Sequence, residues 1–372
     1  MPAEGSGSFA RTRVRGPPMK KATLTLIDLF AGCGGMTRGF VDAGFTPVFA
    51  VECDRDAAAT YAANFGDHVF ADFIERVDSF PKADVIIGGP PCQGFSPLNM
   101  QGVGLERRTL WREYLRALRE SAPSVFVMEN VPELLRSGEY AAFKAAAEQL
   151  GFVVEGRVLN AADYGVPQTR RRAIVIGSRV GLPSWPAQTH WAPGKLAHEG
   201  LPWRTFRWAV DNPIALPLVP TAANWHNPRN PRDISLERYR TIPKEGEGRF
   251  HLAERRPDIT PQCWLRKKTG STDVFGRLWW DRPAFTIRTE FYKPEKGRYL
   301  HPSEHRPITV REAARCQTMP DDFTLPGDQP MTSIAKQIGN AVPCLLAQRI
   351  AEVVAADLAV SSDTTRALEL VG

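Results

Sequence analysis

The first feature that could carry chemistry is a cysteine in a loop shaped by proline and glycine. Cys92 lies in the run Pro90-Pro91-Cys92-Gln93-Gly94, directly after the apolar stretch 84–89 (DVIIGG). The prolines fix backbone φ before the thiol, and the glycine frees the backbone after it. A strand followed by such a loop delivers a side chain to the carboxyl edge of an open α/β sheet, where ligands bind. The loop therefore suggests a nucleophilic cysteine, although a cysteine is also a common packing residue.

A carboxylate and a basic strand follow the same logic further along the chain. Glu129 and Asn130 end the apolar run in VMENVP, where a proline stops the extension. The run YGVPQTRRR then carries Gln168, Arg170 and Arg172 at alternate positions. Alternate residues of a strand face the same way, so these three side chains are predicted to point together. Adjacent arginines are also consistent with a solvated edge.

A glycine-rich turn between a strand and a helix predicts a nucleoside site. Gly32 and Gly34 lie in LIDLFAGCGG, and Glu52 ends the next strand 20 residues after Gly32. Glycines permit a tight turn beside a ligand, and an acidic residue at the second strand tip accepts hydrogen bonds from ribose hydroxyls. The third glycine that seats a pyrophosphate is missing, which favours a nucleoside without a diphosphate.

S-adenosylmethionine is the cofactor that this turn suits. Asp28 is expected to face the positively charged end of the cofactor, and Phe30 is expected to cover the adenine. Asp72 closes the short apolar run 68–71 and is expected to bond the adenine amino group.

Apolar runs and amphipathic stretches alternate along the first half of the chain, which predicts an α/β fold with a doubly wound, parallel sheet and helices on both faces. The expected strands are 24–30, 47–51, 68–71, 84–87, 125–128, 153–159 and 173–177, and the expected helices are 36–43, 54–64, 109–119 and 141–150. Two further helices are expected at 309–317, beginning with a capping box, and at 333–356, interrupted at its start by Gly339 and Pro343.

The 372 residues exceed what one core usually supports, so a second, smaller domain is expected. We predict a disordered basic arm at 1–22, a catalytic and cofactor-binding domain at 23–184, an irregular domain at 185–330 and a C-terminal helix at 331–372 that returns to the catalytic domain. The stretch 185–298 holds 20 Lys or Arg against 12 Asp or Glu, and eight of the nine tryptophans. That composition fits polyanion binding, or equally a Trp-rich core under a solvated surface.

The six cysteines are far apart and form no C-x-x-C pair, which argues against zinc and against a disulfide framework. No metal is assigned. No apolar run approaches a membrane span or a secretory signal, so no membrane partner is expected, and the protein is expected to work in the cytosol or on the chromosome.

Together these motifs resemble those of the cytosine-C5 DNA methyltransferase family. The motifs appear in that family's usual order and cover about residues 24–180 and 306–356: DLFAGCGG, GGPPCQGFS, MENV, QTRRR, ITVREAARCQTMPDDF and QIGNAV. The stretch between them, 185–305, lies where this family keeps its target-recognition domain. The resemblance implies transfer of a methyl group from S-adenosyl-L-methionine to C5 of a cytosine flipped out of double-stranded DNA.

The resemblance also assigns roles to single residues. Cys92 looks like the nucleophile that attacks C6 of cytosine, and Glu129 resembles the acid that holds N3. Arg172, with Arg170, is similar to the strand that contacts the pyrimidine O2 and supports the glutamate. The residues implied around the cofactor are Asp28, Phe30, Gly32, Gly34, Glu52, Asp72, Leu110, Asn340 and Val342, and those implied around the substrate are Gln93, Ser96, Asn130 and Gln168. At the end of the loop after the cysteine, Arg108 replaces the Asn common in relatives.

Two alternatives remain open from sequence. One branch of the family methylates tRNA cytosine, and a relative that has lost catalysis would only bind DNA. Against the first stands the run Gln93-Gly94-Phe95-Ser96, which is closer to the DNA-acting pattern. Against the second stands the intact set of Cys92, Glu129 and Arg172. We expect a monomer whose partners are DNA and a separate cognate restriction endonuclease.

Overall fold

A computed structural model describes residues 23–91, 110–194, 200–217, 225–266, 269 and 271–369, with side chains up to residue 361. The predicted arm at 1–22 and the cysteine loop from Cys92 to Thr109 lie outside the described residues. No helix in the described part of the chain is long and apolar enough to cross a membrane.

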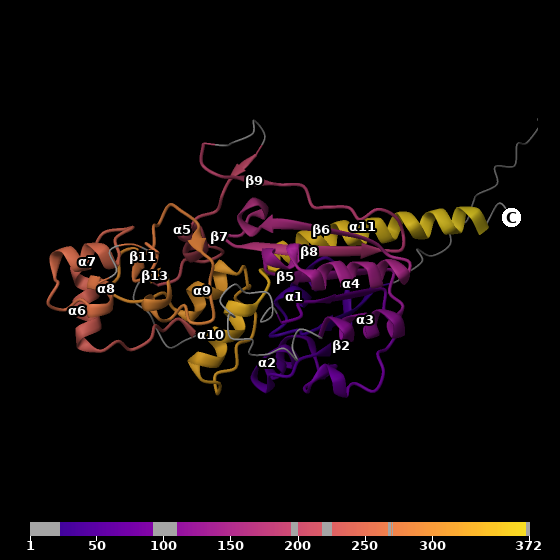
Figure 1. Ribbon diagram of the computed structural model, residues 1–372, viewed down its shortest axis with the longest axis horizontal. Coiled ribbons are helices and arrows are strands. Elements are labelled where there is room, and N and C mark those ends of the chain that lie inside the picture. The colour runs from indigo at the N-terminus through magenta and orange to yellow at the C-terminus, as the bar shows by residue number, and fades with distance from the viewer. Residues whose placement is uncertain are drawn as a thin grey trace, which may run out of the picture.

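A seven-stranded sheet forms the centre of the larger part, with helices on both faces (Figure 1). Its strand order is β3-β2-β1-β4-β5-β8-β6. The strands are β1 (Thr25–Leu29), β2 (Thr46–Val51), β3 (Val69–Phe70), β4 (Val85–Gly88), β5 (Val125–Asn130), β6 (Val153–Asn160) and β8 (Arg171–Ser178). The seven predicted strands are all present, and the α/β, doubly wound fold class is confirmed.

The prediction of a wholly parallel sheet is wrong for one strand. β8 runs antiparallel to both of its neighbours, β5 and β6. Only the ten residues 161–170 connect β6 to β8, whereas a parallel connection needs a crossover of about a dozen residues or more. The short connection therefore forces the chain to turn back beside β6.

Alternate residues of the central strands belong to two different cores. Leu26, Val85 and Val127 pack with α1 (Gly35–Asp42) and α11 (Cys344–Glu369) on one face. Ile27, Ile86 and Phe126 pack with α3 (Leu110–Ser121) and α4 (Gly138–Gln149) on the other. α2 (Arg55–Phe65) follows β2. The period of two in a strand thus produces the layered arrangement.

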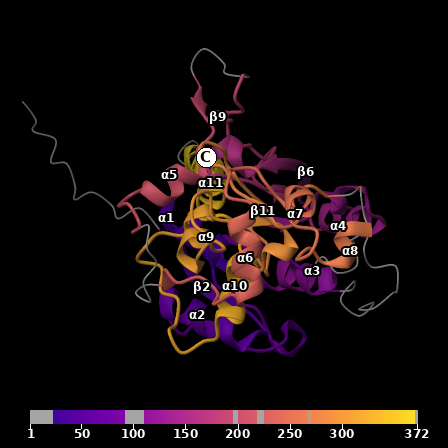
Figure 2. The same cartoon turned by 90° about the vertical axis from the view of Figure 1, so that its left-hand side faces the viewer.

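The rest of the chain forms a smaller body of short elements, as its prolines predict. Figures 1 and 2 show α6 and α7 at the end of the molecule that lies away from the C-terminal part of α11. The helices are α5 (Phe206–Asp211), α6 (Asp233–Thr241), α7 (Arg249–Arg255), α8 (Gln262–Arg266), α9 (Val310–Cys316) and α10 (Met331–Asn340). The short strands are β7 (Gln168–Thr169), β9 (His190–Trp191), β10 (Leu201–Pro202), β11 (Gly276–Arg277), β12 (Ala284–Phe285) and β13 (Arg298–Leu300). One core joins α5, α9 and α10 to residues 278–308, so the domain limit at 330 stays a proposal.

α9 begins where the sequence places it. Thr309 is the N-cap residue, its side chain accepts a hydrogen bond from the Glu312 amide, and the Glu312 carboxylate accepts one from the Thr309 amide. This is the predicted capping box. The predicted interruption near Gly339 and Pro343 also occurs, because α10 ends at Asn340 and α11 starts at Cys344.

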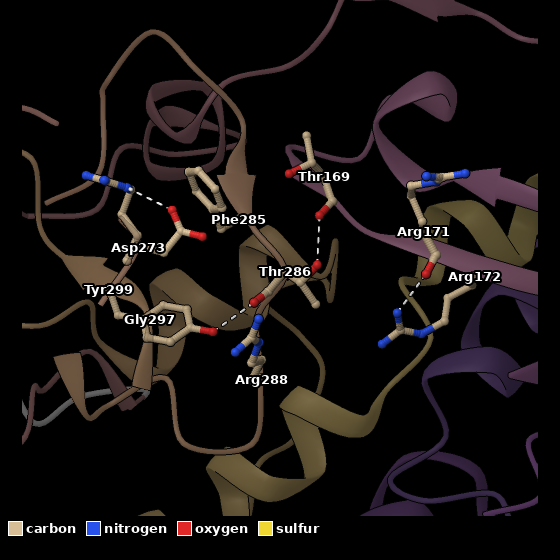
Figure 3. Close-up of a pocket in the computed structure, with 10 residues that line it drawn as sticks. Thr169, Arg171, Arg172, Asp273, Phe285, Thr286, Arg288, Gly297 and Tyr299 are labelled. Atoms are coloured by element: carbon tan, nitrogen blue, oxygen red, sulfur yellow. Dashed lines mark hydrogen bonds and ion pairs between the residues drawn. The ribbon is translucent and has the colours of Figure 1, made fainter. Parts of the chain in front are cut away.

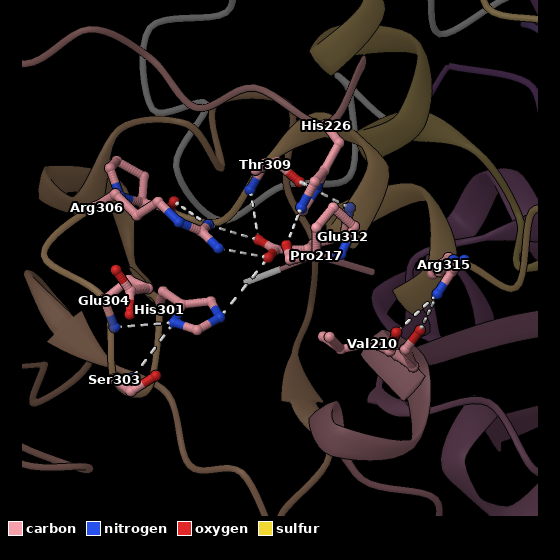
Figure 4. A network of polar contacts seen from close by, with 12 residues as sticks. Val210, Pro217, His226, His301, Ser303, Glu304, Arg306, Thr309, Glu312 and Arg315 are labelled. Carbon is pink, nitrogen blue, oxygen red and sulfur yellow. Dashed lines mark hydrogen bonds and ion pairs between the residues drawn. The ribbon is translucent and has the colours of Figure 1, made fainter. Parts of the chain in front are cut away.

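A buried polar network holds the segment before α9 (Figure 4). Arg306 donates two hydrogen bonds to the Glu312 carboxylate, at 2.8 and 2.9 Å. Nδ1 of His301 accepts the backbone amides of Ser303 and Glu304, and burial lowers the pKa of His301 to about 3. The imidazole is therefore neutral at pH 7, and the network serves to fix the loop rather than to bind a proton.

The crossing of α1 and α11 allows a test of the packing. A Cβ on Gly39 would lie 2.4 Å from the Cys344 carbonyl oxygen and 2.6 Å from the Ala347 Cβ. We expect Gly39→Ala to lower the free energy of unfolding by about 1–3 kcal/mol, because the helices must separate. In the control Gly138→Ala the added methyl meets nothing within 4 Å, so stability should stay within about 1 kcal/mol of wild type. Denaturant unfolding measures both, and equal effects of the two changes would contradict this packing.

Candidate active site

Glu129 lies at the carboxyl end of β5, beside an arginine from the next strand. The Arg172 Nε is 2.8 Å from the Glu129 Oε1, and the Glu129 residue is 9% exposed. Alternate residues of a strand face the same side of the sheet. Glu129 is two residues from Val127 and Arg172 is two residues from Ile174, and both of these pack in the core under α1 and α11. Both side chains therefore lie at the end of that face of the sheet. The ion pair holds the carboxylate in one orientation at the edge of the sheet.

The end of β4 is attached to the same place. The Asn130 Nδ2 donates to the Pro90 carbonyl oxygen at 2.9 Å, and the Asn130 Oδ1 accepts the Val131 amide at 2.8 Å. Gly89 is so near that a Cβ there would lie 3.1 Å from the Glu129 Oε2. The chain that leads to residue 92 is therefore fixed against the carboxylate. Cys92, Gln93 and Ser96 themselves lie outside the described residues.

The prediction that Gln168, Arg170 and Arg172 point together is wrong only for Arg172: Gln168 and Arg170 both bond the Ile287 backbone, whereas Arg172 pairs with Glu129. Gln168 is completely buried, and its amide bonds the Gln317 side chain and the Ile287 backbone. Arg170 is 2% exposed and donates to the carbonyl oxygens of Ile287 and Gly339, both at 3.1 Å.

The strand alternation is interrupted at Arg170, because β7 ends before it and β8 begins after it. Of the three side chains, only Arg172 has a described contact with Glu129. The described contacts of Gln168 and Arg170 join this segment to residues 287, 317 and 339.

The buried guanidinium of Arg170 makes a stability prediction. Arg170→Ala leaves two buried carbonyl oxygens without that donor, so we expect a loss of about 3 kcal/mol in the free energy of unfolding. Arg171→Ala is the matched control, because Arg171 is exposed and should change stability by less than about 0.5 kcal/mol. Thermal unfolding of both variants is the measurement. Similar melting temperatures would show that the hydrogen bonds of Arg170 do not stabilise the fold.

The turn after β1 has the geometry that a nucleoside cradle needs. Phe30, Gly32 and Gly34 all have positive φ, at 57°, 56° and 89°. The Glu52 Oε2 accepts the Gly32 amide at 2.8 Å, while its Oε1 accepts the Asp54 amide at 2.7 Å. Burial raises the pKa of Glu52. Each carboxylate oxygen keeps a lone pair, so the residue can still accept ribose hydroxyls.

Asp28 lies below this turn rather than in it. The Asp28 residue is 1% exposed, and its carboxyl accepts the Thr37 hydroxyl from α1. Burial raises its pKa to about 7, partly offset by that hydrogen bond and increased by nearby Glu52. The described geometry gives no support to a direct contact between Asp28 and a cofactor, because the side chain is enclosed by the protein.

The raised pKa of Asp28 predicts a pH dependence of stability. In the unfolded chain the carboxyl ionises above about pH 4, whereas in the folded protein it stays protonated up to about pH 7. Folding stability is therefore lost as the pH rises through this window. Asp28→Asn cannot ionise, so its stability relative to wild type should increase by about 2–3 kcal/mol from pH 5 to pH 8. Unfolding free energies across that range test this, and a difference independent of pH would contradict it.

The remaining predicted cofactor residues differ in their surroundings. Val342 is buried against α1, where its carbonyl oxygen would lie 2.7 Å from a Cβ on Gly35. Leu110 starts α3 and is half-buried, and Asn340 is exposed at the end of α10. Asp72 is bound by both of its oxygens to the exposed Arg76 and accepts the Phe73 amide. The contact of Asp72 with adenine therefore remains a prediction.

A pocket of about 350 Å³ opens beside Arg172 (Figure 3). One wall comes from β7 and β8, and the other from residues between 273 and 299. The lining residues are Thr169, Arg171, Arg172, Asp273, Phe285, Thr286, Arg288, Gly297, Arg298 and Tyr299. Periodicity and motif reasoning did not single out Arg288 or Tyr299, because their place depends on folding between distant segments.

Groups of three or more potential metal ligands are absent from the part of the chain that the structure describes. His301 and His305 lie four residues apart in the sequence, but His301 is held in the network before α9.

Comparison with known proteins gives a consistent result. The family model described as C-5 cytosine-specific DNA methylase matches residues 24–356. M1.HphI of Haemophilus parahaemolyticus, named a Type II methyltransferase, is 35% identical over 352 residues and covers 89% of this chain and 87% of its own. M.NgoFVII of Neisseria gonorrhoeae, with the same description, is 32% identical and covers 93% of this chain and 89% of its own.

Solved structures share the fold. A structure described as a DNA modification methyltransferase encoded within an E. coli prophage has a TM-score of 0.65 at 24% identity, covering 90% of this chain and 99% of that one. The Entamoeba histolytica methyltransferase EhMeth has a TM-score of 0.61 at 15% identity, covering 91% and 99%. At these identities the likeness concerns the fold alone.

Proposed function

Because the chain belongs to the family of C-5 cytosine-specific DNA methylases, we propose that it methylates C5 of a cytosine flipped out of double-stranded DNA through a covalent bond between Cys92 and C6. The observation that carries the proposal is the hydrogen bond from the Asn130 side chain to the Pro90 carbonyl oxygen, which holds the segment after β4 beside Glu129. Cys92 follows Pro90 by two peptide bonds, which span at most about 7.6 Å between Cα atoms. The Cys92 thiol and the Glu129 carboxyl can therefore both reach the same pyrimidine ring.

The reaction explains why these residue types are needed. C5 of cytosine is too electron-poor to attack a methyl donor, so a nucleophile must first add to C6. A thiolate attacks well and leaves well, and covalent catalysis divides one difficult step into two. Glu129 holds N3 and supplies a proton as electrons move onto the ring. Arg172 orients that carboxyl through the 2.8 Å ion pair.

S-adenosyl-L-methionine is the methyl donor that we propose, and it supplies an electrophilic methyl group when bound. The residues present fit its nucleoside part, because a Cβ built on Gly32 meets nothing within 4 Å and the Glu52 carboxylate beside it can accept ribose hydroxyls. Val342 packs against Gly35 of α1. After methyl transfer, a base removes the C5 proton and Cys92 leaves C6.

The biological setting is also part of the proposal. Relatives named Type II methyltransferases support a modification enzyme of a restriction-modification system, with a cognate endonuclease acting separately. We propose that the protein works as a monomer at the bacterial chromosome in the cytoplasm. Bisulfite sequencing of DNA from a host that expresses the chain tests the activity and reveals the methylated site. A tRNA methyltransferase would instead modify labelled tRNA and leave duplex DNA unmodified.

The roles of Cys92 and Glu129 predict that their substitution removes or slows methyl transfer without removing DNA binding. Cys92→Ser should abolish methyl transfer, and Glu129→Gln should reduce its rate by about 10²- to 10⁴-fold, while both variants retain duplex binding. Glu133→Gln is the control, because this exposed glutamate lies just beyond β5. Transfer of labelled methyl groups and duplex binding are measured in parallel. Normal transfer by either site variant would refute the mechanism.

A further inference from the structure

The pocket between β8 and the recognition stretch carries an excess of positive charge. Four of its lining residues are arginines, at positions 171, 172, 288 and 298, and one is an aspartate, Asp273. Figure 3 shows Arg288 on one wall and Arg171 and Arg172 on the other. A pocket with this charge favours an anionic ligand.

Two of the four charges are already engaged. Arg172 is paired with Glu129 at 2.8 Å. Arg298 donates to backbone carbonyl oxygens, including those of Gly246 and Thr272, and its Nε lies 3.8 Å from Asp273 and makes no hydrogen bond.

Arg171 and Arg288 are different. Neither has a carboxylate within ion-pair distance among the residues that the structure describes. Both residues are exposed. The uncompensated charge of the pocket therefore comes chiefly from Arg288, because Figure 3 shows the Arg171 side chain directed away from Arg288 and Arg172.

The aromatic side chains of the pocket do not offer a site for a stacked base. Tyr299 is 1% exposed, and its hydroxyl donates to the Thr286 carbonyl oxygen. Phe285 stacks with Trp279, and the Arg298 guanidinium lies 5.7 Å from the Phe285 ring centroid. Since these surfaces are already covered, the free interactions of the pocket are those of guanidinium groups.

We propose that Arg288 binds a phosphate next to the flipped cytosine on the target strand. The inference rests on the proposed function. Arg172 belongs both to this pocket and to the site of Glu129, so the pocket adjoins the place proposed for the flipped base. A guanidinium matches the two oxygens of a phosphate with parallel hydrogen bonds. Arg288 is thus a substrate-binding residue that positions the extruded nucleotide.

Salt dependence tests the contact directly. The probes are a duplex carrying the site found by bisulfite sequencing and a duplex of equal composition without it. Arg288→Ala should lower the slope of log affinity against log salt by about 0.9 and weaken binding of both probes by a similar factor. Arg288→Lys, which keeps the charge, should restore most of the slope.

A matched control removes an arginine charge at the opposite edge of the sheet. Arg119 is exposed in the last turn of α3, shortly before β5 begins. Arg119→Ala should leave the slope and the affinity unchanged.

Replacing a single charged phosphate of the DNA by an uncharged methylphosphonate identifies which phosphate Arg288 contacts. A methylphosphonate at one of the two linkages flanking the target cytosine should weaken wild-type binding about tenfold and weaken Arg288→Ala binding less than twofold. Equal losses for both proteins at each linkage would overturn the proposal. Loss of discrimination between the two duplexes in Arg288→Ala would also overturn it, because that result marks a base contact.

The outcomes separate this inference from the proposed function. Absence of methyl transfer to DNA by the wild-type protein would remove the function and the inference together. Normal transfer by the wild type with an unchanged salt slope in Arg288→Ala would overturn the inference alone.

Discussion

The hydrogen bond from Asn130 to the Pro90 carbonyl oxygen is the contact on which the site depends. It joins the carboxyl ends of two neighbouring parallel strands, β4 and β5, two residues beyond the last pair of their hydrogen-bond ladder, Gly88 and Met128. Gly89 permits the approach, since a side chain there would press on Glu129. The segment that precedes Cys92 and the carboxylate of Glu129 are thereby fixed at one edge before any ligand arrives. Preorganisation of this kind lowers the entropic cost of aligning reacting groups.

Much of this arrangement could be predicted from the sequence because it depends on local signals. The apolar runs gave the strands of the sheet, and the Thr309–Glu312 spacing gave the capping box of α9. Glu52 was placed at a strand tip beside the glycine turn, where it accepts the Gly32 amide. Parallel strands bring their carboxyl ends to one edge, so residues that end separate apolar runs were expected to meet there.

The remainder depends on partners that are distant in the sequence. Arg170 bonds carbonyl groups of Ile287 and Gly339, which are 117 and 169 residues away. Simple alternation cannot anticipate these bonds, because the strand is interrupted at Arg170 itself. The charge of Asp28 in this motif suggests a ligand contact, but the fold encloses the side chain against Thr37, where burial decides its protonation. Charge in a motif therefore indicates importance without distinguishing a binding residue from a buried support.

The buried amides explain how recognition and chemistry are held together. Gln168 bonds Gln317, whose Nε2 donates to the carbonyl oxygens of Ile338 and Ala341. The Gln168 Oε1 also accepts the Ile287 amide, two residues after β12. Since Ala341 adjoins the segment that packs on α1 and Ile287 adjoins Arg288, one set of hydrogen bonds fixes that segment and one wall of the basic pocket relative to each other. A displacement of the segment around Ile287 must therefore break buried hydrogen bonds.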